Sequence, residues 1–364
     1  MRTVWAWSVF IRLLARYLCS RVGWMRRVDF RDRLEGMTVV ASQLLGWRKM
    51  RVLDPEHCPK EPPAVFVSNH IWLSDPMLAW PAIYYSSGER IATHFMMRDD
   101  FFRGGLWRWL PFNVDDIAEM CGAIRISRGN VQWSQMKPFL KVLEAPGAFL
   151  MYPGGTRSRS GLVFEYRESA EEIGGASFFV SHVQRRLGKP VPAVPMARTC
   201  HPVSGQSVLA FGAPLYVAAG ADRAALRAFD AELAVRVAGL IEINVPHIMS
   251  GLLYLRCLHG GAPHLGVEEL AQMVRDVVSR IRGRHVDPAA LMDVKDEVEA
   301  MLGYFARYAM LTVEEGVVAL NPDRILSCPP LDTQYYRNNP VKFQINQILH
   351  FSEVIDLIED AALR

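Results

Sequence analysis

The stretch PAVFVSNHIWLSDP, residues 63–76, joins an apolar run to a polar turn and the start of a helix. The run 64–67 lies between a proline and a serine, which is typical of a short buried strand. Asp75 is followed by proline, and this pair predicts a helix that begins there. The turn between strand and helix carries His70, so an imidazole and a carboxylate are brought close in sequence at the end of a strand.

Apolar runs and helical spacings alternate along the rest of the first 220 residues. Further strands are predicted at 91–97, 123–126, 148–152, 191–196 and 208–211, and helices at 131–144 and 173–187. The helix that starts at Asp75 should pass Trp80 and be kinked or shortened by Pro81. Strands that alternate with helices indicate an α/β fold, a mixed sheet covered by helices.

From Asp222 onward the spacing is mostly helical. Helices are predicted at 224–244, 247–258, 267–282, 288–310 and 335–362, with a short strand at 317–320. We therefore expect three parts: an N-terminal amphipathic helical region (1–52), an α/β domain (53–220) and a mostly helical C-terminal domain (221–364).

Composition excludes several classes of protein. The net charge of +3 is too small to indicate a nucleic-acid partner, and no basic run alternates with aromatic residues. The six cysteines are scattered, without a CxxC pair or a histidine at zinc-ligand spacing. We therefore expect neither a disulfide framework nor a metal site. We also expect the protein to reside in a reducing compartment.

The N-terminal region combines aromatic and aliphatic side chains with arginines. The apolar residues 4–18 are interrupted by Arg12 and Arg16, so they are too short to span a bilayer, which needs about 20 apolar residues. The pattern predicts a helix lying in the headgroup layer, hence a peripheral protein at the cytoplasmic face of a membrane. The alternative is a core helix whose arginines extend to solvent.

His70 and Asp75 could form a catalytic pair. If Asp75 accepts a hydrogen bond from one ring nitrogen, the other nitrogen is left as a base. Such a base can deprotonate an alcohol that attacks an acyl carbonyl directly. A hydrolase is disfavoured because no G-x-S-x-G elbow is present. The alternative is that Asp75 only caps a helix and His70 is a surface residue.

A second segment, YPGGTRSRSG at residues 152–161, follows a predicted strand. Its glycines allow backbone N–H groups to approach an anion, and Arg157 and Arg159 could bind phosphate oxygens. The GK[ST] ending of a Walker loop is missing. The alternative is a solvated loop.

Two further segments complete the set. The segment CGAIRISRGN, residues 121–130, is a strand that brings Arg128 to the edge where the other loops open. Otherwise Arg128 is an ordinary surface arginine. The segment VPAVPM, residues 191–196, favours an edge strand because of its prolines, and it could line an apolar channel.

In their order, the four segments resemble the four blocks of the glycerolipid acyltransferase superfamily, the 1-acylglycerol-3-phosphate and glycerol-3-phosphate acyltransferases. The family pattern N-H-x4-D is matched from Asn69, G-x-I-x-I-x-R from Gly122, F-P-E-G-T-R-S at Pro153 and 155–158, and V-P-x-x-P from Val191. The resemblance covers roughly residues 60 to 215, close to half of the chain, and the order of the four matches makes it more specific than any one of them.

The resemblance implies an acyl donor on CoA or acyl carrier protein, no other cofactor, and a glycerol phosphate or lysophospholipid acceptor. It implies that His70 is the general base and Asp75 its orienting partner. The residues implied for acceptor binding are Arg128, Gly155, Thr156, Arg157, Ser158 and Arg159. The aromatic segment 101–112, with Met96 and Met97, could shape an acyl tunnel or be ordinary core.

One position departs from the family pattern. Gly154 stands where the third block carries glutamate, which puts the acceptor in question; Glu165 and Glu168 are near enough in sequence to replace it. The departure leaves an alternative, a catalytically weak or inactive relative that binds acyl lipids or a partner protein. Residues 244–253 and 335–339 also resemble segments that follow the catalytic domain in bacterial glycerol-3-phosphate acyltransferases, which leaves the subfamily open.

Overall fold

The computed structural model describes residues 50–72, 74–98, 122–126, 133–145, 147–154, 156–165, 175–283, 285–330 and 333–364. It also describes Ile11, Ala15 and Cys19, which are helical. The rest of the expected membrane-associating region, the aromatic segment 101–112, and Arg128 and Gly155 lie outside the described residues. Among the helices that are described, none is both long and apolar enough to cross a bilayer.

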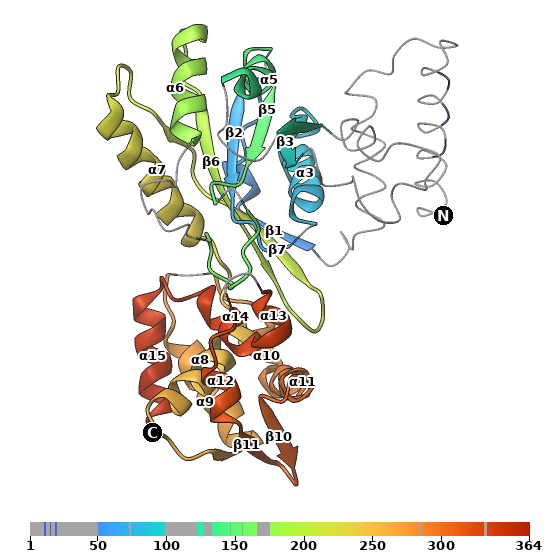
Figure 1. The fold of residues 1–364 in the computed structure, drawn as a ribbon, viewed down its shortest axis with the longest axis vertical. Coiled ribbons are helices and arrows are strands. Elements are labelled where there is room, and N and C mark those ends of the chain that lie inside the picture. The colour runs from blue at the N-terminus through green and yellow to red at the C-terminus, as the bar shows by residue number, and fades with distance from the viewer. Residues whose placement is uncertain are drawn as a thin grey trace.

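A large sheet forms the first half of the described chain (Figure 1). Its strands are β1 Met50–Leu53, β2 Ala64–Ser68, β3 Thr93–Arg98, β4 Ala123–Ile126, β5 Ala148–Met151, β6 Pro192–Cys200, β7 Ser207–Phe211 and β8 Leu215–Tyr216. Their order is β1-β7-β6-β2-β5-β3-β4, and β8 pairs with β6. Strands β2 to β6 are mutually parallel, so their carboxyl ends open at one edge of the sheet.

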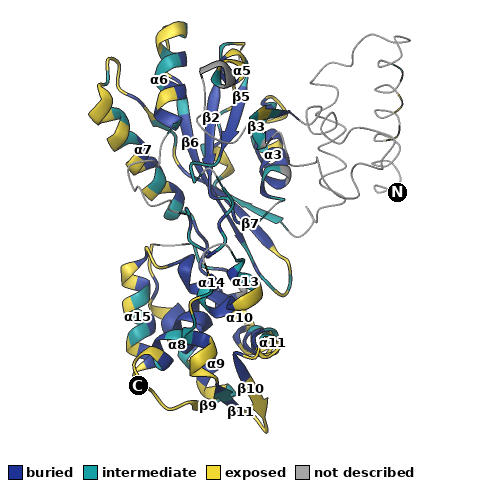
Figure 2. Ribbon diagram, viewed as in Figure 1, coloured by how far each residue is buried: buried dark blue, intermediate teal, exposed yellow. Residues whose placement is uncertain are grey.

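Helices cover both faces of this sheet, as the alternation of strands and helices predicted. They are α3 Asp75–Ser86, α5 Trp133–Glu144, α6 Ala176–Leu187 and α7 Arg223–Ala238, with a short 3-10 turn η2 at Pro55–His57. Every residue of β2 is buried (Figure 2). Phe66 packs in the core that contains Trp80 of α3, whereas Val65 and Val67 face the core shared with α5, α6 and α7. Such burial on both faces is characteristic of a central parallel strand.

The second half is mostly helical, as expected. Its helices are α8 Val245–Leu258, α9 Val267–Arg280, α10 Ala289–Met292, α11 Val294–Ala306, α12 Pro322–Leu326, α13 Tyr335–Asn338, α14 Pro340–Asn346 and α15 Ser352–Ala362. A small antiparallel sheet joins β9 His264–Gly266, β10 Leu311–Glu314 and β11 Val317–Leu320. Figure 1 shows α13 and α14 on the side of these helices that faces the large sheet.

The prediction of one helix over 335–362 is wrong, because the chain forms α13, α14 and α15 there. Asn339 has φ −142° and ψ 81°, which are not helical, and its side chain caps α14 by accepting from the N–H of Lys342. Pro340 follows it at the first position of α14, where its missing N–H costs no helical hydrogen bond. Pro340 therefore marks the start of a new helix, α14, within the segment that was expected to be one helix.

The expectation of an edge strand at 191–196 is also wrong. β6 lies inside the sheet, between β2 and β7, and continues to Cys200. Pro195 lies between the part of β6 that pairs with β8 and the part that pairs with β7, where the ladder changes partner. A proline without an N–H is tolerated at such an interruption. Pro81, similarly, does not end α3, which continues to Ser86.

Candidate active site

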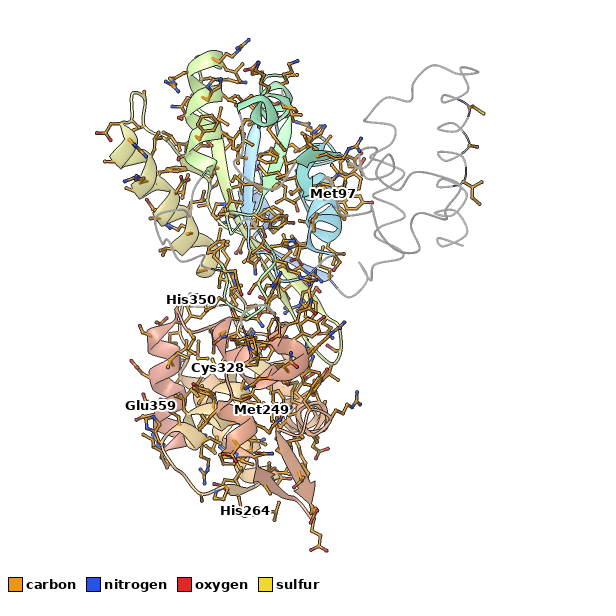
Figure 3. The ribbon with its side chains drawn as sticks, viewed as in Figure 1. Met97, Met249, His264, Cys328, His350 and Glu359 are labelled. Carbon is orange, nitrogen blue, oxygen red and sulfur yellow. The ribbon has the colours of Figure 1, made fainter. Side chains whose placement is uncertain are left out.

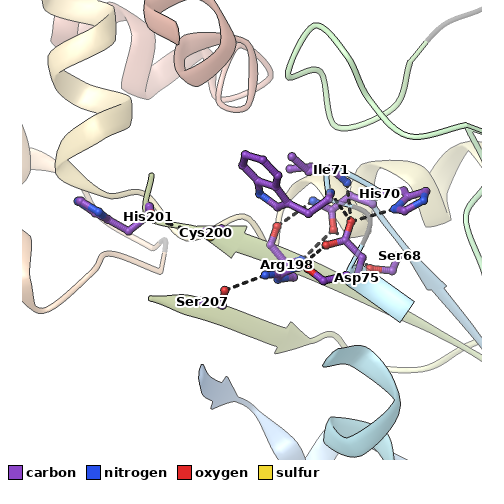
Figure 4. A network of polar contacts seen from close by, with 11 residues as sticks. Ser68, His70, Ile71, Asp75, Arg198, Cys200, His201 and Ser207 are labelled. Carbon is purple, nitrogen blue, oxygen red and sulfur yellow. Dashed lines mark hydrogen bonds and ion pairs between the residues drawn. The ribbon is translucent and has the colours of Figure 1, made fainter. Parts of the chain in front are cut away.

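The loop after β2 wraps around the carboxylate of Asp75 (Figure 4). Nδ1 of His70 lies 2.9 Å from Oδ2 of Asp75, the first residue of α3. The same oxygen accepts the backbone N–H groups of Ile71 at 2.6 Å and Trp72 at 2.7 Å. The carboxylate thus fixes both the imidazole and the backbone of the loop that carries it.

A buried arginine holds the other side of this carboxylate, and sequence reasoning missed it. Nη1 of Arg198, on β6, donates to Oδ1 of Asp75 at 2.5 Å and to Oγ of Ser74 at 3.1 Å. Nη2 donates to Oγ of Ser207 on β7 at 3.0 Å. Asp75 is 2% exposed and Arg198 6% exposed, so this is a buried ion pair. Asn69 pairs with both backbone groups of Arg198, which ties the start of the loop to β6.

These contacts decide the ionisation of Asp75. Burial alone would raise the pKa of Asp75, but the hydrogen bond from His70 and the positive charge of Arg198 lower it below its ordinary value of 3.8. An ionised carboxylate only accepts hydrogen bonds, so Nδ1 of His70 is assigned the proton. Nε2 is then the free, basic nitrogen of the ring.

Tyr152, directly after β5, packs against the imidazole of His70. The two rings are stacked with their centroids 4.4 Å apart. The hydroxyl of Tyr152 is buried and has no hydrogen-bond partner among the described residues. Burial, together with the charge of Asp75, raises the pKa of Tyr152 well above 10.0, so the phenol stays neutral. Its ring is one wall of the site and restricts rotation of the imidazole.

The segment with the two arginines is tied to the loop of His70. We call residues 156–161 the arginine loop. The N–H of Ser158 donates to the carbonyl oxygen of His70 at 2.7 Å, which places Arg157 directly beside that contact in sequence. Among the described residues, none accepts a hydrogen bond from the side chain of Arg157. The structure thus brings together the two segments expected to share a site.

Glu165 holds the arginine loop from within. Its Oε2 accepts the hydroxyl groups of Ser158 at 3.0 Å and Ser160 at 2.9 Å, and the N–H of Arg159 at 3.3 Å. Its Oε1 accepts the N–H of Ser160 at 3.3 Å. A Cβ atom built on Gly154 would lie 3.6 Å from the backbone nitrogen of Glu165. A carboxylate is therefore present at the loop, although position 154 itself is glycine.

The remaining expected site residues are placed in part. β4 ends at Ile126, two residues before Arg128, and its carboxyl end lies at the same edge as those of β2 and β5. Met96 and Met97 are both half-buried, but they pack against the cores on opposite faces of the sheet. Figure 3 labels Met97 near the end of β3. Only one of the two methionines can face a given acyl chain.

No group of three or more His, Cys, Asp or Glu side chains in the described part of the chain could hold a metal ion. The donors that converge on Asp75 are instead an imidazole, a guanidinium and two backbone N–H groups. The polar groups of the site serve to orient one another.

Comparison with known proteins finds similarity to acyltransferases. A family model described as "Acyltransferase" matches residues 49–198, which include β2, β6 and the segments around His70 and Arg157. A crystal structure of the 1-acyl-sn-glycerophosphate (LPA) acyltransferase PlsC from Thermotoga maritima is similar, with 16% sequence identity and a TM-score of 0.40; the match covers 66% of this chain and 96% of that one. No curated protein matches this chain in sequence. Residues 49–198 of this chain are therefore similar to the acyltransferase family over the part that carries His70, Asp75 and Arg157.

Proposed function

We propose that this acyltransferase moves a fatty acyl group from a CoA or acyl carrier protein thioester to a hydroxyl of a glycerol phosphate or lysophospholipid. The observation that carries the proposal is the geometry around His70. Its Nδ1 faces the buried Asp75 carboxylate, and its carbonyl oxygen binds the arginine loop through Ser158. A base and a phosphate-binding loop are the two parts that acylation of a phosphorylated alcohol requires.

The reaction needs one base and no covalent enzyme intermediate. Nε2 of His70 takes the proton of the acceptor hydroxyl as its oxygen attacks the thioester carbonyl carbon. Asp75 stabilises the imidazolium that forms. The C–S bond then breaks, and the imidazolium returns the proton to the departing thiolate, giving an ester and a thiol. The lowered pKa of Asp75 keeps its negative charge in place throughout this cycle.

The acceptor's phosphate would be bound by the arginine loop. Arg157 and Arg159 supply guanidinium groups that can form bidentate, charge-assisted hydrogen bonds to phosphate. Arg128 follows β4 at the same edge of the sheet and would contribute a third. Thr156 and Ser158, with the backbone of Gly155, would add donors to the same anion.

An assay of the full chain tests the proposal. Purified protein is given acyl-CoA or acyl carrier protein thioester, with glycerol 3-phosphate or 1-acylglycerol 3-phosphate, and lipid products are extracted. We expect product, and a loss of about 10²- to 10⁴-fold in kcat for His70→Ala, the usual contribution of a general base. His264→Ala is the matched control, because His264 is exposed on β9. Equal turnover by His70→Ala and wild type would overturn the proposal.

A second candidate function rests on Gly154 and on the additional helical half of the chain. The place of Gly154 in the family pattern is that of a glutamate, so a relative that binds acyl lipids or a partner without turnover is the alternative. Absence of product with every donor and acceptor, together with retained binding of acyl lipid, would favour it.

The proposed setting is peripheral, at the cytoplasmic face of a membrane. Its basis is the mixture of aromatic residues and arginines in residues 1–27. The full chain should float with anionic liposomes, and a variant that lacks residues 1–27 should not. Unchanged flotation would contradict the assignment.

A further inference from the structure

The C-terminal helices contact the loop that carries His70. The indole ring of Trp72, two residues after His70, lies 5.0 Å from the ring of Tyr336 and 6.0 Å from that of Phe343, measured between centroids. Ile71 and Phe343 belong to one small buried cluster and are 4% and 1% exposed. The backbone segment that wraps Asp75 is therefore packed against α13 and α14.

The same two helices hold the arginine loop by hydrogen bonds. The N–H of Tyr335, the first residue of α13, donates to the carbonyl oxygen of Arg159 at 2.9 Å. Nδ2 of Asn346, the last residue of α14, donates to the carbonyl oxygen of Ser160 at 2.9 Å. Asn346 is 9% exposed, so its bond is shielded from water. Consecutive carbonyl groups of the loop are bound by opposite ends of one helical segment.

Gly161 shows how closely the loop and α14 approach. Its φ is +96°, a conformation that side-chain-bearing residues rarely adopt, and a Cβ built there would lie 2.1 Å from the carbonyl oxygen of Phe343. Any side chain at 161 would force α14 away from the loop. Glycine is required here by close backbone contact between the two halves of the chain.

The helices that make these contacts are anchored in the C-terminal half. The side chain of Asn339, which is 0% exposed, donates to the carbonyl oxygens of Ile325 and Ser327, each at 2.9 Å. The hydroxyl of Tyr335 donates to the carbonyl oxygen of Pro329 at 2.8 Å. α14 also packs against the buried helix α8. The segment is thus rigidly attached on its far side.

We propose that residues 335–346, which we call the clasp, are part of the acyl acceptor site and position the arginine loop relative to His70. This inference rests on the proposed function, and it gives the helical half a role in binding the acceptor. A glycine- and serine-rich loop loses much conformational entropy when it is ordered. Because the clasp orders the loop before the acceptor arrives, that cost does not weaken acceptor binding.

The clasp acts through the arginine loop and touches none of the reacting atoms, so its residues are positioning residues. The reacting thioester group of the donor carries no phosphate for the arginine loop to bind. Loss of a clasp contact should therefore weaken binding of the acceptor and leave binding of the donor unchanged. A purely structural role would instead lower the melting temperature and affect both substrates alike.

Asn346→Ala tests this, with Gln272→Ala as the matched control. Gln272 is exposed on α9, outside the clasp, and its side-chain amide donates to Asp276 on the same helix. We expect Asn346→Ala to raise the acceptor KM roughly tenfold, the effect of losing one shielded hydrogen bond, with donor KM unchanged. Gln272→Ala should resemble wild type.

Amide hydrogen exchange of residues 156–165, measured without substrates, separates this inference from the proposed function. Asn346→Ala should exchange faster there and remain unchanged in β2 and α8. If the wild-type protein acylates no acceptor, the proposed function fails. The exchange rates would still show whether the clasp orders the arginine loop. If Asn346→Ala does not fold, Tyr336→Leu, at a half-exposed position, removes the ring beside Trp72 and should give the same selective loss.

Two results would overturn the inference. One is wild-type exchange and wild-type acceptor KM in both Asn346→Ala and Tyr336→Leu. The other is an equal loss toward donor and acceptor that accompanies a lower melting temperature.

Discussion

The loop of His70 and the arginine loop meet through one hydrogen bond, yet they are held in different ways. The first is fixed by a buried charge pair from inside the sheet, Asp75 with Arg198. The second is fixed through neutral groups: Glu165 accepts serine hydroxyls and backbone N–H groups of the loop, and the clasp donates to two of its backbone carbonyls. The loop of His70 is thus held by residues within 49–198, the part that matches the acyltransferase family model, whereas the arginine loop also depends on residues outside it.

The difference separates two kinds of sensitivity. Changes near Asp75 leave a buried charge without a partner, which is costly for both stability and chemistry. Changes around the arginine loop remove single hydrogen bonds, whose net contribution is near 1 kcal/mol each. Mutations on the two sides should therefore differ in size and in the kinetic constant that they alter.

The largest effect is expected for Asp75→Asn. An asparagine keeps the shape but loses the charge that orients Nδ1 and stabilises the imidazolium, so kcat should fall roughly 10³-fold. Asp356→Asn, at an exposed position of α15, is the control. Steady-state kinetics with saturating acceptor measure the change. A kcat within tenfold of wild type would contradict the role of Asp75.

Arg198→Met tests the charge pair itself. Removing the guanidinium leaves Asp75 buried and unpaired, so the free energy of unfolding should drop by about 3–5 kcal/mol. Denaturant titration of Arg198→Met, Asp75→Asn and the double variant gives the coupling free energy between the two side chains. The double variant should be less destabilised than the sum of the two single variants; strict additivity would show that the pair contributes nothing.

On the other side, Glu165→Gln should act on binding. The amide retains one oxygen acceptor but loses the charge that collects four hydrogen bonds, so the acceptor KM should rise roughly tenfold with little change in kcat. Glu314→Gln, exposed on β10, serves as control. A fall in kcat with constant KM would place Glu165 on the base side instead.

The last contrast concerns pH and two buried carboxylates. Burial raises the pKa of Glu242 from 4.5 to about 7, although Arg51 lies 2.6 Å away and opposes the shift. A raised folded-state pKa gives stability that is complete below pH 4.5 and is lost as the pH rises through 7. Asp75 has the opposite sign: its stabilisation is present above pH 3.8 and is lost only as the pH falls through its lower folded-state value.

Glu242→Gln should therefore flatten the decline of unfolding free energy between pH 4.5 and 7, while Asp75→Asn leaves that range unchanged. Denaturant titrations across this pH range measure both slopes. An unaltered slope in Glu242→Gln would show that Glu242 does not titrate there.

Sequence patterns located the parts of the site that are local in the chain. His70 and Asp75 are five positions apart, and the strand before them and the helix after them follow from apolar spacing and Asp-Pro. Arg198 was missed because its partner is 123 positions away and because the predicted strand ends at residue 196, two residues before Arg198 and four before the end of β6. An arginine just beyond an apolar strand was the available signal. The clasp escaped for a related reason, since a helical pattern cannot show that Asn346 reaches the backbone of Ser160.

The burial of β2 has a consequence for how the chain unfolds. Val65 and Val67 belong to one contiguous apolar core with Leu252 of α8 and Val298 of α11. The strand that precedes His70 and the C-terminal helices therefore share a single core. Cooperative loss of that core should appear as one calorimetric transition. Each half expressed alone would present a wide apolar face to water, which favours aggregation.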